Sequence, residues 1–305
     1  MEILVDKAEL ENIRLDVFLK EHSDYSRSYI VKIIEEGLVK VSGKVITKPS
    51  YLTKLDDLIT YETLPETIIE AVPEDIPLSI LYEDEDILIV DKPRGMVVHP
   101  SNGHQNGTLV NAVMYHCKDK LSTINGVIRP GIVHRIDKDT SGVLCICKND
   151  IAHKNISEQF ASHTNVRKYK AIVKGVLKDD EGLIDEPIAR DKKNRLRMSI
   201  EKNGKDARTL YKVIKRYDNY TYIECELFTG RTHQIRVHMK SIGHPLLGDL
   251  VYGRKDNNFP KLDGQILHAY YLKIKHPTKD NEIEFISELP SYFIDILDKL
   301  DGKSK

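Results

Sequence analysis

The sequence predicts an α+β protein built from two domains. Its 305 residues exceed one average domain. Short apolar runs joined by turn residues predict hairpin-connected strands, with helices inserted at intervals and without a sustained βαβαβ rhythm. Prolines between residues 64 and 77 indicate an extended linker. We therefore expect a small N-terminal α/β domain at 1–72 and a second domain at 73–305, which has a mixed, mainly antiparallel sheet and flanking helices.

Two helices are expected in the first domain. Leu15, Phe18 and Leu19 follow helical spacing, and a second apolar stripe, after Ser26, ends at Gly37, which suits a C-terminal cap. The rest of the domain predicts short strands at 38–41, 45–46 and 58–61, the first two joined by a turn at 42–44. The module would expose basic residues on its polar faces, namely Arg14, Arg27, Lys32 and Lys40.

The second domain is rich in strands. Apolar runs predict them at 79–82, 87–90, 132–133, 143–147, 168–173, 207–216, 220–229, 267–275 and 282–286. Helices are expected from Thr108 to about His116, after a cap at Asp150, from Thr232 to Ile242 before Gly243, and around 292–300. The apolar side of the helix after Asp150 would carry Ile151, Ile156 and Phe160.

Composition favours a cytoplasmic protein. No apolar run approaches the ~20 residues that a membrane helix needs. The N-terminal sequence lacks the basic region, apolar core and cleavage site of a secretory signal. The four cysteines show neither a disulfide framework nor a CxxC pair. No exposed apolar seam stands out, so a monomer without a membrane partner is our expectation.

Basic residues are concentrated in one strip of a chain whose net charge is −1. Residues 190–216 contain 11 Lys or Arg and three acids. Such a strip can bind a polyanion, with an affinity that falls as salt increases. The alternative is a solvated loop that is basic by chance.

Asp137 is the first candidate for a catalytic residue. It lies in the run Gly131-Ile132-Val133-His134-Arg135-Ile136-Asp137-Lys138-Asp139-Thr140-Ser141-Gly142, between two apolar runs. A carboxylate on a loop held by strands can face a substrate in a fixed geometry. A loop aspartate is nevertheless more often a turn former or a helix cap, and Asp139 illustrates that role.

Two further motifs carry candidate side chains. In the run 228–239, Thr232, Arg236 and Met239 share a helix face, so Arg236 can point inward and keep a facing carboxylate ionised. The alternative is a surface arginine. In the run 166–175, Tyr169 shares a strand face with Ala171 and Val173, a pattern that usually means a core tyrosine.

Metal binding is not expected. His233 and His238 are five residues apart and so lie on different helix faces. Cys145 and Cys147 form a same-face strand pair that is better explained as core.

These motifs together resemble the RluA-type RNA pseudouridine synthases. The run 134–142 resembles the family's H-R-L-D-x-x-T-S-G signature, with Ile136 in the usual leucine position. The runs 91–100, 167–175, 230–236 and 267–277 are similar to its other motifs, in the family order. The resemblance implies the synthase fold, isomerisation of uridine to pseudouridine in RNA and no cofactor, because the bonds are exchanged within one molecule.

The resemblance also implies residue roles. Asp137 would be the catalytic aspartate, and Arg236 would pair with it. Tyr169 would stack on the uracil and could act as a base at the ribose. Arg135 would enter the stack that the flipped base vacates. Residues expected on the RNA-binding side of the site also include His134, Thr140 and Arg231.

The first domain resembles the alpha-L RNA-binding domain. The similar residues include Arg14-Leu15-Asp16, Ser26-Arg27-Ser28 and 33–41, with Ser42 where that family commonly has asparagine. Together, the two domains resemble the RluD-like members that modify large-subunit (23S) ribosomal RNA. Transfer RNA is the alternative substrate, and a non-catalytic RNA-binding ribosome-assembly factor is a second alternative. A glycoside or nucleoside hydrolase would need a second carboxylate, which the motifs do not supply.

Overall fold

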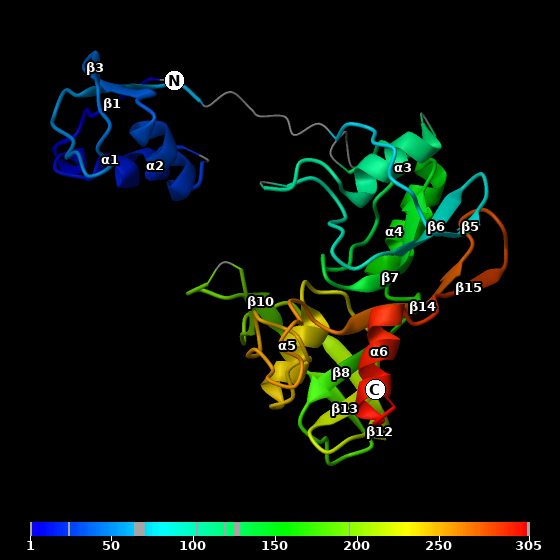
Figure 1. The fold of residues 1–305 in the computed structure, drawn as a ribbon. Helices are drawn as coiled ribbons and strands as arrows, with labels where there is room; N and C mark the ends of the chain where they lie inside the picture. Colours follow the sequence, from blue (N-terminus) through cyan, green and yellow to red (C-terminus); the bar gives the residue numbers. More distant parts are fainter. Residues whose placement is uncertain are drawn as a thin grey trace. The chain divides into compact units, whose positions relative to one another are not determined.

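A computed structural model describes residues 2–23, 25–63, 71–101, 103–118, 120–124, 129–194 and 196–303. The chain divides into two compact units, Met1–Ile68 and Ile69–Lys305 (Figure 1). Each unit has its own hydrophobic core. The predicted domain border after residue 72 stays a prediction, because residues 64–70 lie outside the described ranges.

In the first unit, the described residues form a small antiparallel sheet and two α-helices. The sheet has the order β1-β4-β2-β3 and comprises β1 (Glu2–Leu4), β2 (Val39–Val41), β3 (Lys44–Val45) and β4 (Leu58–Tyr61). The helices are α1 (Leu15–Glu21) and α2 (Arg27–Glu35), after a 3₁₀ turn at Ala8–Leu10. Phe18, Ile33 and Ile59 are buried between these elements. The predicted elements are confirmed, and β1 adds an edge strand that the sequence did not predict.

Local chemistry sets the ends of these elements. The Ser26 hydroxyl oxygen accepts a hydrogen bond from the backbone N–H of Tyr29 and so caps α2. Gly37 follows the helix with a φ of 74°. The turn between β2 and β3 places both Ser42 and Gly43 at positive φ, which matches the twist of a two-residue hairpin. Ser42 therefore adopts a conformation that asparagine or glycine adopts more readily.

The described residues of the second unit form a nine-stranded mixed sheet. Its order is β5-β6-β7-β14-β8-β13-β12-β9, and β15 pairs with β14. The strands are β5 (Ile80–Glu83), β6 (Ile87–Lys92), β7 (Ser141–Cys147), β8 (Val166–Lys174), β9 (Glu181–Asp185), β12 (Arg208–Arg216), β13 (Tyr220–Leu227), β14 (Leu267–Lys275) and β15 (Glu282–Ile286). The pair β7–β14 is parallel and the other pairs are antiparallel, so the predicted fold class is confirmed.

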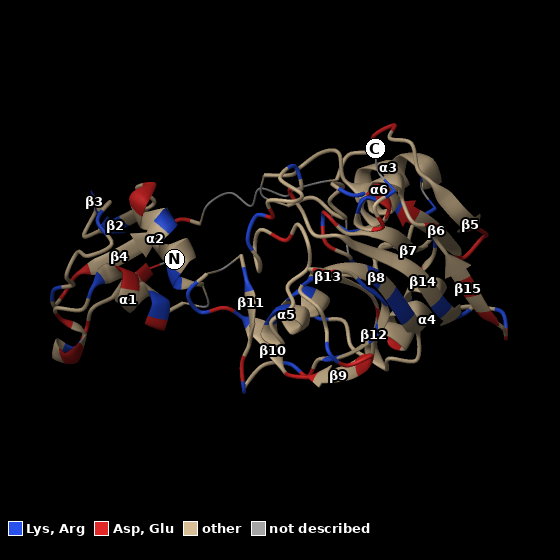
Figure 2. Cartoon of the chain, turned by 60° about the horizontal axis from the view of Figure 1, so that its bottom comes forward, with Lys and Arg blue, Asp and Glu red and all other residues tan. Residues whose placement is uncertain are grey.

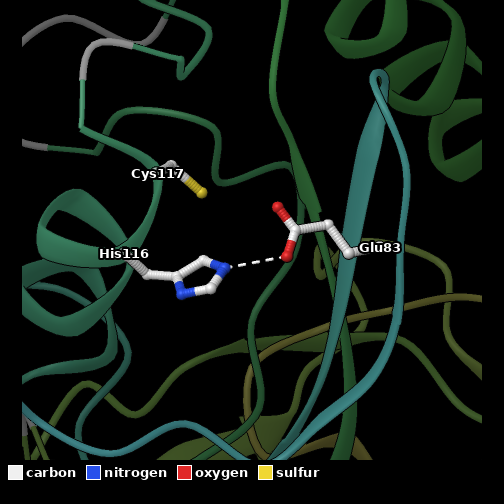
Figure 3. A group of neighbouring side chains, drawn as sticks. All are labelled: Glu83, His116 and Cys117. Atoms are coloured by element: carbon white, nitrogen blue, oxygen red, sulfur yellow. Dashed lines mark hydrogen bonds and ion pairs between the residues drawn. The ribbon is translucent and has the colours of Figure 1, made fainter.

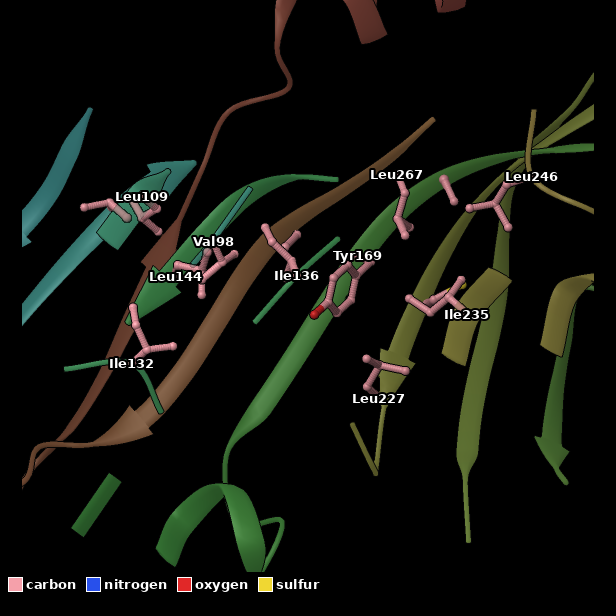
Figure 4. Packing of buried hydrophobic residues seen from close by; sticks show 14 of the residues in the cluster. Val98, Leu109, Ile132, Ile136, Leu144, Tyr169, Leu227, Ile235, Leu246 and Leu267 are labelled. Carbon is pink, nitrogen blue, oxygen red and sulfur yellow. The ribbon is translucent and has the colours of Figure 1, made fainter. Parts of the chain in front are cut away.

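Helices cover both faces of this sheet. They are α3 (Leu109–Cys117), α4 (Asp150–Ala161), α5 (Gln234–Ser241) and α6 (Ser291–Leu300). On one face, Leu109 of α3 and Ile235 of α5 belong to the same core as Tyr169 of β8 (Figure 4). On the other face, Ile156 of α4 and Phe293 of α6 pack on separate clusters. A short hairpin of β10 (Ile188–Arg190) and β11 (Met198–Ile200) forms its own two-stranded sheet.

Some details of the predicted elements are wrong. Residues 132–133 do not form a strand: Ile132 makes a single bridge to Ile146. The backbone N–H of Cys145, which a longer strand would pair with on this edge of β7, donates instead to the His134 side chain. The helix α4 is capped by the Asn149 side chain, which accepts from the Ala152 N–H.

The side chains next to that cap also differ from the prediction. Asp150 instead accepts hydrogen bonds from the Ser122 hydroxyl and the Thr123 N–H. Ile151, expected on the apolar side of α4, is 68% exposed. Phe160, by contrast, packs on the cluster that contains Ile156. The cap therefore lies one residue earlier than expected, and the first apolar residue of the helix faces solvent.

The helix α5 begins later than predicted. His233 has a left-handed φ of 57°, so the helix starts at Gln234 and Thr232 lies outside it. The strands β9, β10 and β11 were not predicted, since their short sequences lack a clear alternation. None of the helices in the described ranges combines the length and apolarity needed to cross a lipid bilayer.

Candidate active site

A pocket of about 510 Å³ lies beside β8 in the second unit. It is lined by the loop before β7, the end of α4, β8 and the start of α5. Seven of the residues selected from the sequence line it, namely His134, Arg135, Asp137, Thr140, Tyr169, Arg231 and Arg236. The other four, Arg14, Arg27, Lys32 and Lys40, belong to the first unit.

Asp137 and Arg236 are in direct contact within a three-residue ion-pair network. Arg236 Nη1 donates to Asp137 Oδ2 at 2.8 Å. The other side of the guanidinium binds Asp249, with Nε to Oδ2 at 2.7 Å and Nη2 to Oδ1 at 3.0 Å. Arg236 is 5% exposed and Asp249 1%. Burial lowers the pKa of Arg236, but the two carboxylates outweigh it and raise that pKa overall, so the guanidinium stays charged.

Asp249 was missed by the sequence reasoning. It follows a Leu-Leu-Gly run and lies in no periodic element, so its sequence position gives no sign of a role. Its Oδ1 also accepts from the backbone N–H groups of Val251 and Tyr252. These bonds hold the Asp249 carboxylate in place. The carboxylate in turn orients the Arg236 guanidinium, so that Nη1 points toward Asp137.

Lys92 anchors the loop that carries Asp137 to the protein interior. This side chain is fully buried, and its Nζ donates to the carbonyls of Pro93, Met96 and Lys138 at 2.8–3.1 Å. Burial lowers the pKa of Lys92 to about 7, although Asp139 and Asp137 act in the opposite direction. Lys92 thus joins the motif at 91–100 to the loop of Asp137.

The end of the same loop requires a glycine. Gly142 has a φ of 116°, and a Cβ on it would lie 2.2 Å from the carbonyl oxygen of Ala269. The adjacent Ser141 Oγ is hydrogen-bonded to His268 Nδ1 at 2.8 Å and to the Tyr292 hydroxyl at 2.7 Å. The close approach of β7 and β14 therefore sets the position of the loop within the sheet.

His134 and Thr140 line the pocket but are already bound by protein groups. His134 Nε2 accepts from the Cys145 N–H at 3.0 Å, and the ring stacks on Phe160. Burial lowers the pKa of His134 to about 3, so the imidazole is neutral. Thr140 is buried and its Oγ1 accepts from Gln265. Both side chains therefore position the loop, and their contact with RNA stays a prediction.

Tyr169 forms part of the apolar wall of the pocket. It lies among Ile136, Leu227, Ile235 and Leu267 (Figure 4). Burial raises the pKa of its hydroxyl; the charge of Arg167 lowers that pKa and the charge of Asp137 raises it further. The ring is thus a neutral phenol in an apolar slot that suits a planar base.

Comparisons with known proteins agree with this geometry. The sequence profile of the RNA pseudouridylate synthase family matches residues 86–241, and that of the S4 domain matches residues 13–59. The chain belongs to the RNA pseudouridylate synthase family. An uncharacterized RNA pseudouridine synthase of Aquifex aeolicus is 49% identical to this synthase and covers 99% of it, over 98% of its own length. The ribosomal large subunit pseudouridine synthase D of Zymomonas mobilis is 46% identical, over 87% of this chain and 86% of its own.

Solved structures show the same fold. The human RNA pseudouridylate synthase domain containing 4 has a TM-score of 0.58 and 24% identity to the synthase. It covers 73% of this chain and 93% of its own. The human RNA pseudouridylate synthase domain containing 1 has a TM-score of 0.55 and 24% identity. The match covers 78% of this chain and 98% of the human chain.

His233 also belongs to the site of the synthase, although the sequence reasoning considered it only as a metal ligand. Its Nε2 lies 3.8 Å from Asp137 Oδ1, and its Nδ1 is hydrogen-bonded to the Tyr252 hydroxyl. Burial lowers the pKa of His233, while Asp137 opposes that shift. His238 is instead fully buried, and both of its ring nitrogens have protein partners, Thr209 and Glu186.

Among the residues that the structure describes, two clusters have the spacing of metal ligands. In the first, Glu83, His116 and Cys117 face one another (Figure 3). Glu83 already binds His116 Nε2 and Lys148 Nζ, both at 2.8 Å. A lysine on the same carboxylate supplies the positive charge that a metal would supply.

The second cluster of this kind contains Asp84, Asp86 and His276. Asp84 binds His276 Nε2 at 2.7 Å and Lys279 Nζ at 3.0 Å. Burial acts against ionisation of Asp84, but backbone and side-chain hydrogen bonds hold its pKa well below the usual range. As in the first cluster, ion pairs with protein side chains account for the arrangement.

In the first unit of the synthase, a buried aspartate holds two of the predicted RNA-binding residues. Asp16 binds Arg14 Nε at 2.9 Å and Arg27 Nη2 at 2.6 Å. Burial raises the pKa of Asp16, but the two arginines outweigh it and leave that pKa lowered. The arginine side chains remain about half exposed, and Lys32 and Lys40 are exposed as well.

Proposed function

We propose that this synthase converts specific uridines of large-subunit ribosomal RNA to pseudouridine, with Asp137 as the catalytic residue. The observation that carries the proposal is the Asp137 carboxylate, which is aimed into the pocket and held by Arg236, which Asp249 holds in turn. The support for ribosomal RNA is that relatives at 38–46% identity bear the name ribosomal large subunit pseudouridine synthase D.

The reaction needs one charged acid and no external reactant. The bond between ribose C1′ and uracil N1 breaks, the base rotates, and a bond from C1′ to C5 forms. The C5 hydrogen leaves as a proton and N1 gains one, so atoms and charge balance. An ionised Asp137 can attack the uracil ring or the anomeric carbon to form a covalent adduct. It can instead remove a ribose C2′ proton to give a glycal.

Tyr169 is proposed to stack on the uracil. Base–aromatic stacking contributes about 1–3 kcal/mol per base. The raised pKa of the phenol makes it a poor base near neutral pH, so proton removal at the ribose would fall to Asp137. Extrusion of the base from the RNA costs a few kcal/mol. The exposed Arg135, next to the catalytic loop, would occupy the vacated position in the stack.

The first domain, proposed at 1–72, would add affinity for RNA through Arg14, Arg27, Lys32 and Lys40. The catalytic domain, proposed at 73–305, would add the β10–β11 hairpin, along which Lys and Arg are clustered (Figure 2). We also propose that the synthase is a cytoplasmic monomer that needs no cofactor and does not bind a membrane. Deletion of residues 1–70 should lower RNA affinity and site selectivity and leave the catalytic domain folded.

The test is release of tritium from C5-labelled uridine in large-subunit ribosomal RNA transcripts. Wild type should release it, and Asp137→Asn should be slower by at least about a thousandfold. Equal rates for the two would reject Asp137 as the catalytic residue. Release from transfer RNA transcripts alone would reject the ribosomal substrate. Tight RNA binding without release from any RNA, including assembled subunits, would favour a non-catalytic assembly factor.

A further inference from the structure

Arg167 on β8 presents a buried guanidinium to the pocket, and none of the described residues forms an ion pair with it. Its side chain lines the pocket, and the residue is 8% exposed. Within the described residues, its Nε and Nη2 are buried and have no hydrogen-bond partner. Burial lowers the pKa of Arg167, because nearby groups do not offset the loss of contact with water. A buried cation without a partner is costly, so the free enzyme carries a site that an anion would complete.

Neighbouring groups make this end of the pocket strongly positive. The Arg167 guanidinium lies over the Phe160 ring, 5.2 Å from its centre, in a cation–π contact. On the other side, a Cβ on Gly230 would lie 2.5 Å from Arg167 Nη1. The glycine therefore lets the guanidinium approach the turn that carries Arg231. Burial lowers the pKa of His163 in this region, and the charges of Arg167 and Arg231 lower it further.

We propose that Arg167, assisted by Arg231, binds a phosphodiester of the RNA next to the flipped uridine. This inference rests on the proposed function, because it assumes that RNA enters the pocket. Asp137 and Tyr169 provide the part of the pocket that suits the ribose and the base. A phosphate joined to that ribose then falls within the same pocket, at its basic end. The planar fork of arginine matches two phosphate oxygens at once.

The free enzyme gives the first test. Arg167→Met removes an unpaired buried charge, so the thermal midpoint of the free protein should stay or rise. A merely structural arginine would instead give a lower midpoint. Inorganic phosphate, compared with chloride at equal ionic strength, should raise the midpoint of wild type and of the control but not of Arg167→Met. The control is Lys275→Met, which removes an exposed cation that pairs with Asp280 outside the pocket.

The second test measures the contact with RNA itself. The probe is an RNA fragment around the mapped target uridine, with a neutral methylphosphonate on its 5′ or its 3′ side. Arg167→Met should bind the unmodified fragment about tenfold to a hundredfold more weakly. The slope of the logarithm of its RNA affinity against the logarithm of salt concentration should become shallower by about one. One neutral linkage should weaken wild type and Lys275→Met by a similar factor and leave Arg167→Met nearly unaffected, while Arg167→Lys should recover part of the affinity.

The outcomes separate the two proposals. The phosphodiester subsite is supported if one neutral linkage lowers the affinity of wild type and has little further effect on Arg167→Met. Independent, additive losses at both linkages, or unchanged affinity of Arg167→Met, would overturn it while the enzyme remains an active synthase. Phosphate stabilisation that depends on Arg167, without coupling to any RNA linkage, would overturn the RNA assignment and leave a site for free phosphate. Absence of tritium release by wild type would instead count against the proposed function.

Discussion

Replacement of Asp249 by asparagine should separate the position of Asp137 from its presence. Asp249 makes two charged hydrogen bonds to Arg236, at 2.7 and 3.0 Å. Asparagine keeps one oxygen for the N–H groups of Val251 and Tyr252, but its amide would face a guanidinium donor. Removal of one partner of a buried ion pair costs about 3–5 kcal/mol. Asp137 remains 2.8 Å from Arg236, so we expect the free energy of unfolding to fall by about 3 kcal/mol.

The rate should fall as well. Without Asp249, Arg236 no longer holds Asp137 in one orientation, and small displacements of a catalytic group can cost about a hundredfold. We expect a 10- to 100-fold lower single-turnover rate of tritium release, roughly in line with that effect. The assays are urea unfolding and single-turnover release at saturating enzyme.

A matched control is Asp256→Asn. Asp256 is also buried and pairs with Lys174 at 2.8 Å, but it lies outside the pocket. Its loss should destabilise the protein to a similar degree and leave the rate unchanged. The reasoning is refuted if Asp249→Asn loses stability yet matches the Asp256→Asn rate, because Asp249 would then act on the fold alone.

Three further predictions concern the walls of the site. Gly142→Ala should lower the free energy of unfolding by about 3 kcal/mol or more in urea titrations, since its Cβ would collide with Ala269 at a positive φ; a loss below about 1 kcal/mol would contradict the contact. Tyr169→Phe should keep a rate within about tenfold of wild type, whereas Tyr169→Leu should lose about tenfold to a hundredfold, both by tritium release; equal rates would exclude stacking. His134 has a lowered pKa, so its contribution to stability is present above about pH 6.5 and is lost as pH falls toward 3. When the pH is lowered from 7 to 5, the free energy of unfolding of His134→Asn should therefore fall by about 1–2 kcal/mol less than that of wild type, as measured by urea unfolding. An identical pH dependence of the two proteins would indicate that His134 is solvated.

Sequence patterns predicted the regular elements better than the side-chain network. The strands β14 and β15 have the predicted bounds, because the turn residues from Pro277 to Asn281 separate two strand-forming runs. Helix α5 begins late because His233 adopts a left-handed conformation, which periodicity does not encode. Arg236 was visible because a recognisable motif surrounds it. Asp249 was not, because it contacts Arg236 through a turn without regular spacing.

Arg167 illustrates a different limit. It lies in one of the motifs selected from the sequence, two residues before Tyr169. Its character as a buried cation whose Nε and Nη2 have no hydrogen-bond partner among the described residues depends on Phe160 and Gly230. These residues come from α4 and from the turn before α5. No pattern within β8 could show that its neighbours from elsewhere in the chain supply no carboxylate.

The position of β14 has a consequence for how the enzyme is made. This strand lies in the middle of the sheet, between β7 and β8, although it is formed late in the chain, at residues 267–275. The loop of Asp137 precedes β7, whereas Tyr169 lies on β8, on the other side of β14. During synthesis, the two halves can therefore join only after residue 275 has left the ribosome. Nascent chains should then be unable to modify RNA before this central strand has emerged, so its assembly delays the onset of activity.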